Sequence, residues 1–397
     1  MTYAWSIDES TAWPPRGRPT RPFGPTTLEV LRSCPLRGCF ERSTGYERRM
    51  SFDGRIGTAF HRTLQSLVEQ RSRVVTAVEI AQETRRRFDT ELRTQEAHAD
   101  ERPRERSLPR DTSRINHAVD ALVATAQRLV SRGGVGSGSL TGLSHSLTPS
   151  SPPEVEDMLD VPSRTAELEV PVASRDGLFA GRIDRAEHTD AGTHIIDYKS
   201  ALRDDLPDRY IRQVQLYALM WGQTRTDWPV AAEVVYPLTG AVYDVSVDAE
   251  TCQRVGDECR SLVGRIEQER SAYNLATPGD VCKVCEFRPW CRPFWHDQAR
   301  EKTPSIALEK ARWGFEGTIV SITSLDHYWK LRLAWRDTVV EIVAPVDRFP
   351  HLRAAGVGTL IRALDMPLHG LRQRPRARVT EWSEIFLITK PKEPGDV

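Results

Sequence analysis

Two aspartates and a lysine have types and spacing suited to phosphodiester hydrolysis. Asp184 ends the segment GLFAGRID, and Asp197 and Lys199 lie two residues apart in IIDYKS. Side chains two apart project from one face of a strand, and an adjacent strand would bring Asp184 beside them. Two carboxylates can hold Mg²⁺ or Mn²⁺, while the lysine stabilises negative charge or positions the attacking water. A lone D-x-K more often caps a turn or makes surface ion pairs.

Four further residues could complete this site. His61, in GTAFHRTLQSL, could ligate the metal as a neutral imidazole or be a satisfied structural histidine. Glu169, in ELEVPV, could add an oxygen ligand or be a solvated strand carboxylate. Gln213 and Tyr217, four apart in RQVQLYAL, share one helical face. They could contact a nucleic-acid backbone or brace Lys199, with ordinary core packing as the alternative for Tyr217.

The order of these motifs resembles one enzyme family. GTAFH, E-x-P, GRID, IDYKS and Q-x-x-x-Y follow one another as in the RecB-type nucleases of the PD-(D/E)xK superfamily, which include the AddB nuclease domain and CRISPR-adaptation nucleases. The resemblance covers about residues 26–296. It implies a catalytic Lys199, an accessory motif at Gln213 and Tyr217, and three metal ligands, namely His61, Asp184 and Asp197. It also implies a Mg²⁺- or Mn²⁺-dependent deoxyribonuclease, with exonuclease action favoured.

Four cysteines have the spacing of a metal–sulfur centre. VCKVCEFRPWC gives C-x2-C-x5-C at Cys282, Cys285 and Cys291, three ligands that one short loop can present. The RecB-like resemblance places the fourth ligand at Cys34, in RSCPLRGCF, and implies a 4Fe-4S cluster that joins the two ends of the nuclease domain. Zinc is the main alternative, because four thiolates also satisfy its tetrahedral preference. Cys39 competes with Cys34 as the remote ligand.

The elements that must position these residues are helices around one sheet. Apolar periodicity predicts helices after Thr26, after Asp53, within 76–131 and over 208–223. AELEVPV, GLFAGRID and THIIDYKS predict an antiparallel meander, and further strands are expected near 231–236 and 242–247. The expected fold class is α/β, a restriction-endonuclease-like PD-(D/E)xK core with flanking helices.

The domain organisation follows from changes in composition. We expect three parts and one flexible insertion: a leader at 1–24, the nuclease domain at 25–300 with the insertion at about 131–157, and a small all-β, OB-like barrel at 305–397. The barrel strands are predicted at 315–323, 329–335, 338–343, 358–365 and 383–388. Four barrel residues could bind single strands by stacking and charge, although its tryptophans could instead be core residues: Trp329, Lys330, Arg332 and Trp335.

Composition limits the remaining possibilities. Lys+Arg and Asp+Glu are 55 each, so net charge gives no evidence of a polyanionic partner. The absence of an 18-residue apolar stretch argues against a membrane span and favours a cytoplasmic location. No GxxxxGK[ST] loop occurs, so a helicase or ATPase motor is not expected within this chain. We expect partners among helicases and other repair or defence subunits, and the RecB-like resemblance implies DNA ends or single strands as substrate. A noncatalytic iron-sulfur scaffold that binds nucleic acid is the alternative, against which His61, Asp184, Asp197 and Lys199 together argue.

Overall fold

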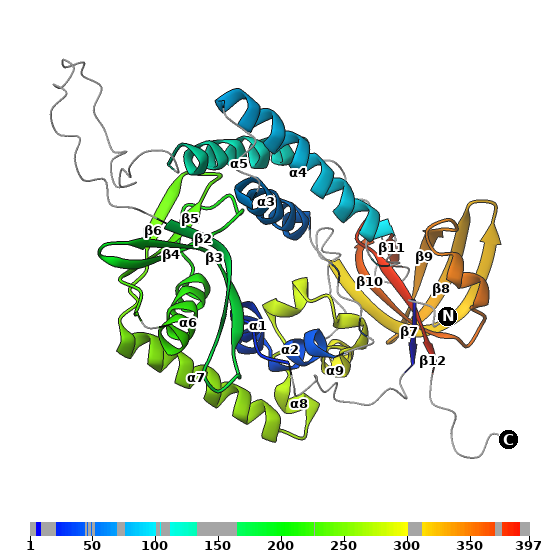
Figure 1. Cartoon of the computed structure of the whole chain (residues 1–397). Coiled ribbons are helices and arrows are strands. Elements are labelled where there is room, and N and C mark those ends of the chain that lie inside the picture. Colours follow the sequence, from blue (N-terminus) through cyan, green and yellow to red (C-terminus); the bar gives the residue numbers. More distant parts are fainter. Residues whose placement is uncertain are drawn as a thin grey trace. The chain divides into compact units, whose positions relative to one another are not determined.

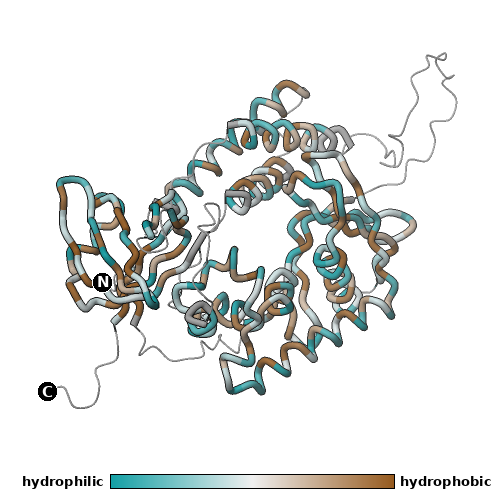
Figure 2. Tube along the Cα trace, turned by 180° about the vertical axis from the view of Figure 1, so that it is seen from behind, coloured by the Kyte–Doolittle hydropathy of each residue, from teal (hydrophilic) through white to brown (hydrophobic). Residues whose placement is uncertain are grey.

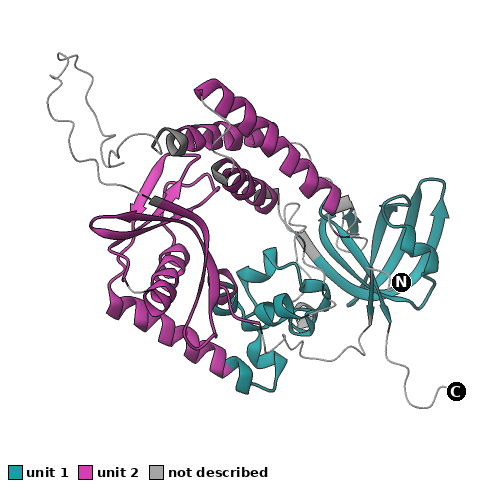
Figure 3. Ribbon diagram, viewed as in Figure 1, with its two compact units in different colours: residues 1–18, 30–49, 266–397 teal, residues 19–29, 50–265 magenta. Residues whose placement is uncertain are grey.

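The chain forms two compact units (Figure 3). The computed structural model describes residues 5–8, 21–43, 46, 49, 52–69, 76–100, 104, 112–132, 165–225, 227–300, 312–369 and 375–389. Unit 1 comprises residues 1–18, 30–49 and 266–397, and unit 2 comprises residues 19–29 and 50–265. The cysteine-bearing segments thus belong to the unit that holds the C-terminal barrel, which differs from the predicted boundary at residue 300.

Unit 2 is built on a five-stranded sheet with the order β2-β3-β4-β5-β6 (Figure 1). The strands are β2 (Thr165–Ala173), β3 (Ala180–Thr189), β4 (Gly192–Tyr198), β5 (Ala231–Tyr236) and β6 (Ala241–Asp244). β2, β3 and β4 pair antiparallel, as the predicted meander requires, whereas β5 pairs parallel to β4. The parallel step follows from the crossover helix α6 (Asp208–Thr224), which lies between β4 and β5 in the chain.

Helices contact both faces of this sheet. α3 (Phe52–Glu69), α4 (Ala77–Asp100) and α5 (Thr112–Arg132) share one apolar cluster with Ile196, Tyr198 and Val235. α6 contacts β2, β3, β4 and β5, and its residues from 213 to 221 are buried. Polar and apolar residues alternate along these helices, as one-sided burial requires (Figure 2). α1 (Pro25–Ser33) and α7 (Ala249–Gln268) each have residues in both units.

The cysteine-bearing part of unit 1 is a set of short helices. They are α2 (Pro35–Arg42), α8 (Ala272–Leu275), η2 (Asp280–Val284), η3 (Arg288–Trp290) and α9 (Arg292–Arg300). Leu36, Phe40 and Phe287 form their core, and the rings of Phe40 and Phe287 stack with centroids 5.3 Å apart. Segments about 250 residues apart in sequence are thereby packed together.

The C-terminal part of unit 1 is an OB-like barrel. Its elements are β7 (Arg312–Leu325), β8 (Tyr328–Trp335), β9 (Thr338–Pro345), η4 (Pro350–Ala354), β10 (Leu360–His369), β11 (Arg376–Arg378) and β12 (Glu384–Thr389). β7, β8 and β9 form an antiparallel meander, β11 pairs parallel to β9, and β10 pairs with both β11 and β7. These pairings close the sheet in the Greek-key manner of an OB fold.

Two predicted segments differ from the expectation or cannot be compared with it. Part of the expected leader is docked: β1 (Ser6–Asp8) pairs parallel to β12, and Phe23 bridges to Phe179. The insertion expected at about 131–157 lies outside the described residues, apart from residues 131 and 132. Among the described helices, none combines the length and apolar character that crossing a bilayer requires.

Candidate active site

Asp184, Asp197 and Lys199 converge at the end of β4. Arg185 pairs with Ile196 across β3 and β4, so the register sets Asp184 opposite Asp197, one step beyond the last ladder pair. The Tyr198 backbone N–H donates to Asp184 Oδ2 at 2.7 Å, and Nζ of Lys199 lies 2.6 Å from Oδ2 of Asp197. A hairpin register therefore brings together two acids that are 13 residues apart (197 − 184).

His61 and Glu169 lie beside Asp184. One ligand atom from each of these three residues lies within 4.8 Å of the others, which is the only such set among the described residues. Nδ1 of His61 is 3.6 Å from Oδ1 of Asp184. Glu169 has a φ of 50°, an uncommon conformation for a strand residue with a side chain. An imidazole and two carboxylates at this spacing are a suitable donor set for a divalent cation.

Burial sets the charge states at the site. It raises the pKa of Asp184 well above the usual range, and the nearby Asp197 carboxylate raises it further. Burial also lowers the pKa of His61, which keeps the imidazole neutral and able to ligate. At Lys199 burial opposes the charge, but Asp197 and Asp184 outweigh it and raise the lysine pKa. The half-buried acidic site contains one ammonium group, and its remaining negative charge favours binding of a further cation.

Gln213 forms hydrogen bonds with both Lys199 and Asp197. Its Oε1 accepts from Lys199 Nζ at 3.0 Å, and its Nε2 donates to Asp197 Oδ1 at 3.3 Å and to Tyr217 Oη at 3.2 Å. Gln213 and Tyr217 are 9% and 6% exposed. These hydrogen bonds are the ones that the bracing interpretation predicts. Contact of Gln213 and Tyr217 with a nucleic-acid backbone remains a prediction, and both side chains are buried.

Two glycines that the sequence analysis did not interpret make this packing possible. A Cβ on Gly181 would lie 2.7 Å from the Tyr217 ring, and a Cβ on Gly57 would lie 2.8 Å from Ser200 Oγ. Gly181 lets α6 approach β3, and Gly57 lets α3 approach the loop after Lys199. The signal was present, because both glycines stand inside the motifs GTAFH and AGRID.

The family can be stated from the whole domain. The sequence profile of the PD-(D/E)XK nuclease superfamily matches residues 22–292 of the 397-residue chain. The chain belongs to this superfamily. The match contains every residue of the site and all four cysteines of the predicted cluster. No curated protein matches the chain.

Solved structures also resemble parts of the chain. A replication factor A related protein from Methanobacterium thermoautotrophicum is 19% identical, covering 23% of this chain and 92% of that one, with a TM-score of 0.20. A murine DNA binding protein bound with double-stranded DNA is 10% identical, covering 59% and 99%, with a TM-score of 0.19. Scores this low carry no argument, so the OB-like topology stands on its own strand pairing.

Three of the four predicted cluster cysteines of this PD-(D/E)XK chain follow α8, and the fourth precedes α2. Cys34, Cys282, Cys285 and Cys291 line one cavity, and Cys39 does not. Burial raises the pKa of the Cys282 thiol, raises that of Cys285 to about 12 and raises that of Cys291. Thiolates at these positions would need a cation beside them, so the residues fit a metal centre. The remaining two cysteines, Cys252 and Cys259, are buried in α7, as expected for packing residues.

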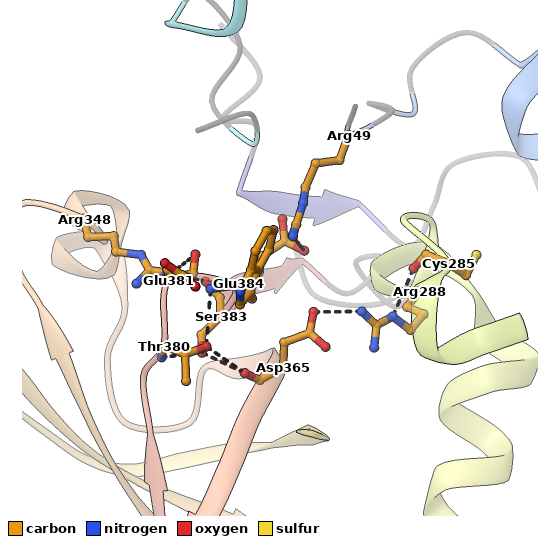
Figure 4. Close-up of polar contacts among 10 residues, drawn as sticks. Arg49, Cys285, Arg288, Arg348, Asp365, Thr380, Glu381, Ser383 and Glu384 are labelled. Atoms are coloured by element: carbon orange, nitrogen blue, oxygen red, sulfur yellow. Dashed lines mark hydrogen bonds and ion pairs between the residues drawn. The ribbon is translucent and has the colours of Figure 1, made fainter. Parts of the chain in front are cut away.

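The cysteine loop is tied to the barrel within unit 1. Arg288 donates through Nε to the Cys285 carbonyl at 3.0 Å and through Nη2 to Asp365 Oδ2 at 2.8 Å (Figure 4). Asp365 has a φ of 58° and lies at an irregularity of β10 between Ala363 and Met366. The side chains of Arg288 and Asp365 are 13% and 6% exposed, so the ion pair is shielded from water.

The barrel tryptophans are core residues. Trp329 and Trp335 are 7% and 4% exposed and belong to the barrel core, and Trp329 donates to the Phe349 carbonyl. β8 alternates and turns both residues inward, which is the core alternative that the sequence left open. Stacking of their rings on bases remains a prediction. Lys330 and Arg332 point to the exposed face of the same strand, beside the exposed Tyr328.

Proposed function

We propose that this chain is a metal-dependent DNA nuclease of the RecB/AddB type, which hydrolyses phosphodiester bonds at DNA ends or in single strands, with exonuclease action favoured. The convergence of Asp184, Asp197 and Lys199 beside His61 and Glu169 carries this proposal. The superfamily match supports it independently.

The residues of the site have different roles in this proposal. His61, Glu169, Asp184 and Asp197 would hold Mg²⁺ or Mn²⁺, which lowers the pKa of bound water and offsets the charge of the phosphate. Lys199 stays protonated between Asp197 and Gln213, so its ammonium is oriented toward developing negative charge. Gln213 keeps that ammonium fixed, which limits the reorganisation needed during the reaction.

Cleavage of end-labelled DNA tests the proposal. Wild type should cut single-stranded or end-bearing DNA only with Mg²⁺ or Mn²⁺, and Asp197→Ala should lose at least about 10³-fold in rate because a metal ligand is removed. Asp190→Ala, at the exposed turn between β3 and β4, is the matched control and should cut normally. The product ladder then distinguishes exonuclease from endonuclease action and gives the polarity.

The rival function predicts a different outcome. A noncatalytic scaffold would bind DNA with equal affinity in wild type and Asp197→Ala, and neither protein would cut it. Equal cutting by both proteins would reject the assigned residues instead. Metal-dependent cutting by wild type together with loss of cutting in Asp197→Ala would exclude both the scaffold function and a wrong assignment of residues.

We assign a 4Fe-4S cluster to Cys34, Cys282, Cys285 and Cys291. The common cavity supports one centre. The one-plus-three arrangement of these cysteines, which resembles the iron-sulfur nucleases, favours the cluster over zinc. Chemical analysis for iron and sulfide with visible absorption tests the assignment; a colourless protein that contains zinc would overturn it. Cys39→Ala, a matched control, should leave the iron content unchanged.

The barrel supplies a second nucleic-acid contact in this proposal. Lys330 and Arg332 are exposed on β8, although Lys330 also pairs with Glu341 at 3.1 Å. Lys330→Gln with Arg332→Gln should weaken single-strand binding and its salt dependence while leaving metal binding intact. Point substitution is preferable to deleting residues 305–397, because Arg288 binds Asp365 of the barrel. A separate helicase or other repair or defence subunit would supply unwound strands.

A further inference from the structure

A cleft opens beside Lys199 on unit 2. It has a volume of about 530 Å³ and is lined from α3, α5, α6 and the loop that follows β4. This volume is in the range of ligand pockets. His61 and Lys199 are among its lining residues, so a ligand in the cleft would lie next to the candidate metal site.

Cations dominate the lining of this cleft. Arg114 at the start of α5, Arg203 in the loop and Arg209 at the start of α6 join Lys199 there. No carboxylate is among the lining residues, although Asp205 pairs with Arg203 at 2.8 Å. Arg114 and Arg209 are exposed residues of the lining, and Arg209 also donates to the Tyr210 hydroxyl at 3.3 Å. Guanidinium groups are suited to binding phosphate.

The loop that carries Arg203 is held in place. Thr239 donates to the Arg203 carbonyl at 3.0 Å, and the Tyr243 hydroxyl donates to the Asp204 carbonyl. The Lys199 backbone N–H donates to the Val235 carbonyl at 2.8 Å. Hydrogen bonds from β5, β6 and their turn therefore fix one wall of the cleft before any ligand binds, which lowers the ordering cost of binding.

Tyr210 adds an aromatic ring to the cations. Lys199 Nζ lies 4.7 Å and the Arg209 guanidinium 4.8 Å from the Tyr210 ring centroid. The ring also packs against Tyr236, with centroids 6.4 Å apart. A positively charged groove with an aromatic platform is the combination that binds single strands without sequence preference.

We propose that this cleft binds a single DNA strand next to the bond being cut, with Arg114 and Arg209 on a phosphate that flanks the scissile one and Tyr210 against a base or sugar. The inference rests on the proposed function, because it takes the metal site as the point of cleavage. In this arrangement only one DNA strand enters the site, so Lys199 and the arginines of the cleft contact one sugar–phosphate backbone rather than two.

Binding of thymidine tetranucleotide to the full chain tests the cleft. We would measure anisotropy without divalent metal over a range of salt concentrations, and KM for cleavage with Mn²⁺. Arg114→Gln and Arg209→Gln should each raise Kd and KM about three- to tenfold and flatten the salt slope by about 0.7. Tyr210→Leu should weaken binding about fivefold or more, and Tyr210→Phe should restore it. Arg254→Gln, on the exposed side of α7, is the matched control and should bind like wild type.

The results separate this inference from the proposed function. Unchanged Kd in all the cleft variants would overturn the cleft assignment, even if the wild type cuts DNA. If the cleft variants bind DNA more weakly than wild type but the wild type does not cut DNA, the cleft assignment is supported and the nuclease proposal is rejected. Mn²⁺ affinity equal to that of wild type shows that each variant retains its fold.

Discussion

Lys199 is fixed by more contacts than a strand-end lysine ordinarily makes. Asp197 lies 2.6 Å from its Nζ, Gln213 accepts at 3.0 Å, and Tyr210 presents its ring at 4.7 Å. Lysine side chains lose much rotamer entropy when they are ordered, so holding Lys199 in one conformation costs free energy that surface contacts would not offset. The cost is consistent with an ammonium that must already be in position when phosphate arrives.

Replacing Gln213 should impair the reaction more than it impairs the fold. Gln213→Leu keeps the volume but removes the hydrogen bonds to Lys199 and Asp197. We expect kcat to fall about tenfold, or about 1.4 kcal/mol of barrier, with KM little changed. A shift in the basic limb of the pH–rate profile is expected as well, because Lys199 loses a hydrogen-bond acceptor that stabilises its charged form. A normal profile with a lowered melting temperature would indicate a purely structural role.

Metal affinity should rise with pH. The pKa of Asp184 is raised by burial and by Asp197, so a proton competes with the cation until the pH exceeds that pKa. The pKa of His61 is lowered, so this residue is already neutral and adds no further change above its usual range. Asp197→Asn removes the negative charge beside Asp184, so metal affinity should begin to rise at a lower pH than in wild type. Mn²⁺ titration by electron paramagnetic resonance at several pH values measures both curves.

The residue types at the site were predictable from sequence, but their geometry was not. The D-x-K spacing predicted that Asp197 and Lys199 share a face, since strand periodicity is local. The φ of 50° at Glu169 has no local signal, because a carboxylate in a strand ordinarily keeps extended backbone. The partners of Gln213 depend on how closely α6 approaches β3, a tertiary quantity set by Gly181.

At the scale of elements, the contact between β3 and α6 is tight at Gly181. Gly181→Ala would place a methyl 2.7 Å from the Tyr217 ring, so we expect a loss of about 1 to 3 kcal/mol in the free energy of unfolding. Gly264→Ala is the matched control, because nothing lies within 4 Å of a Cβ at this helical position. It should instead stabilise α7 by about 0.5 to 1 kcal/mol. Urea denaturation compares the two, and equal effects would contradict the packing argument.

The barrel should lose stability in acid through His351, which stacks on Trp5 and donates to the Ile385 carbonyl. Burial lowers the His351 pKa to about 4, and its buried Nδ1 has no partner. The unfolded histidine titrates near 6.5, so stability is full above that pH and declines as pH falls toward 4. Between pH 7 and 4.5 the loss from this group should be about 2 kcal/mol. His351→Gln should remove that part of the pH dependence; an unchanged slope would contradict it.

Element prediction succeeded where the pattern was long and local. The meander of β2, β3 and β4 followed from alternation, and so did the strands β7 to β10. β11 has three residues, too few to alternate, and was missed. Trp329 and Trp335 face the barrel interior whereas Lys330 faces outward, because neighbouring residues of a strand face opposite sides.

At the scale of the molecule, unit 1 should unfold as one body. The shielded pair of Arg288 and Asp365 joins the cysteine loop to β10, and Arg362 reinforces it through the Pro289 carbonyl at 2.9 Å. A double-mutant cycle of Arg288→Leu and Asp365→Asn should give a coupling of about 1 to 3 kcal/mol. In either single variant the barrel and the cysteine loop should melt separately. A single transition at the wild-type temperature would contradict the coupling.

Unit 1 draws its residues from both ends of the chain, which sets the order of events on the ribosome. Cys34 emerges early, but Cys282 follows 248 residues later (282 − 34). At synthesis rates of about 5 to 20 residues per second, that interval is on the order of 10 to 50 s. The sheet of unit 2 can fold during this interval, before Cys282, Cys285 and Cys291 are available to Cys34. Translation therefore delays completion of the sulfur site until the sheet of unit 2 has left the ribosome.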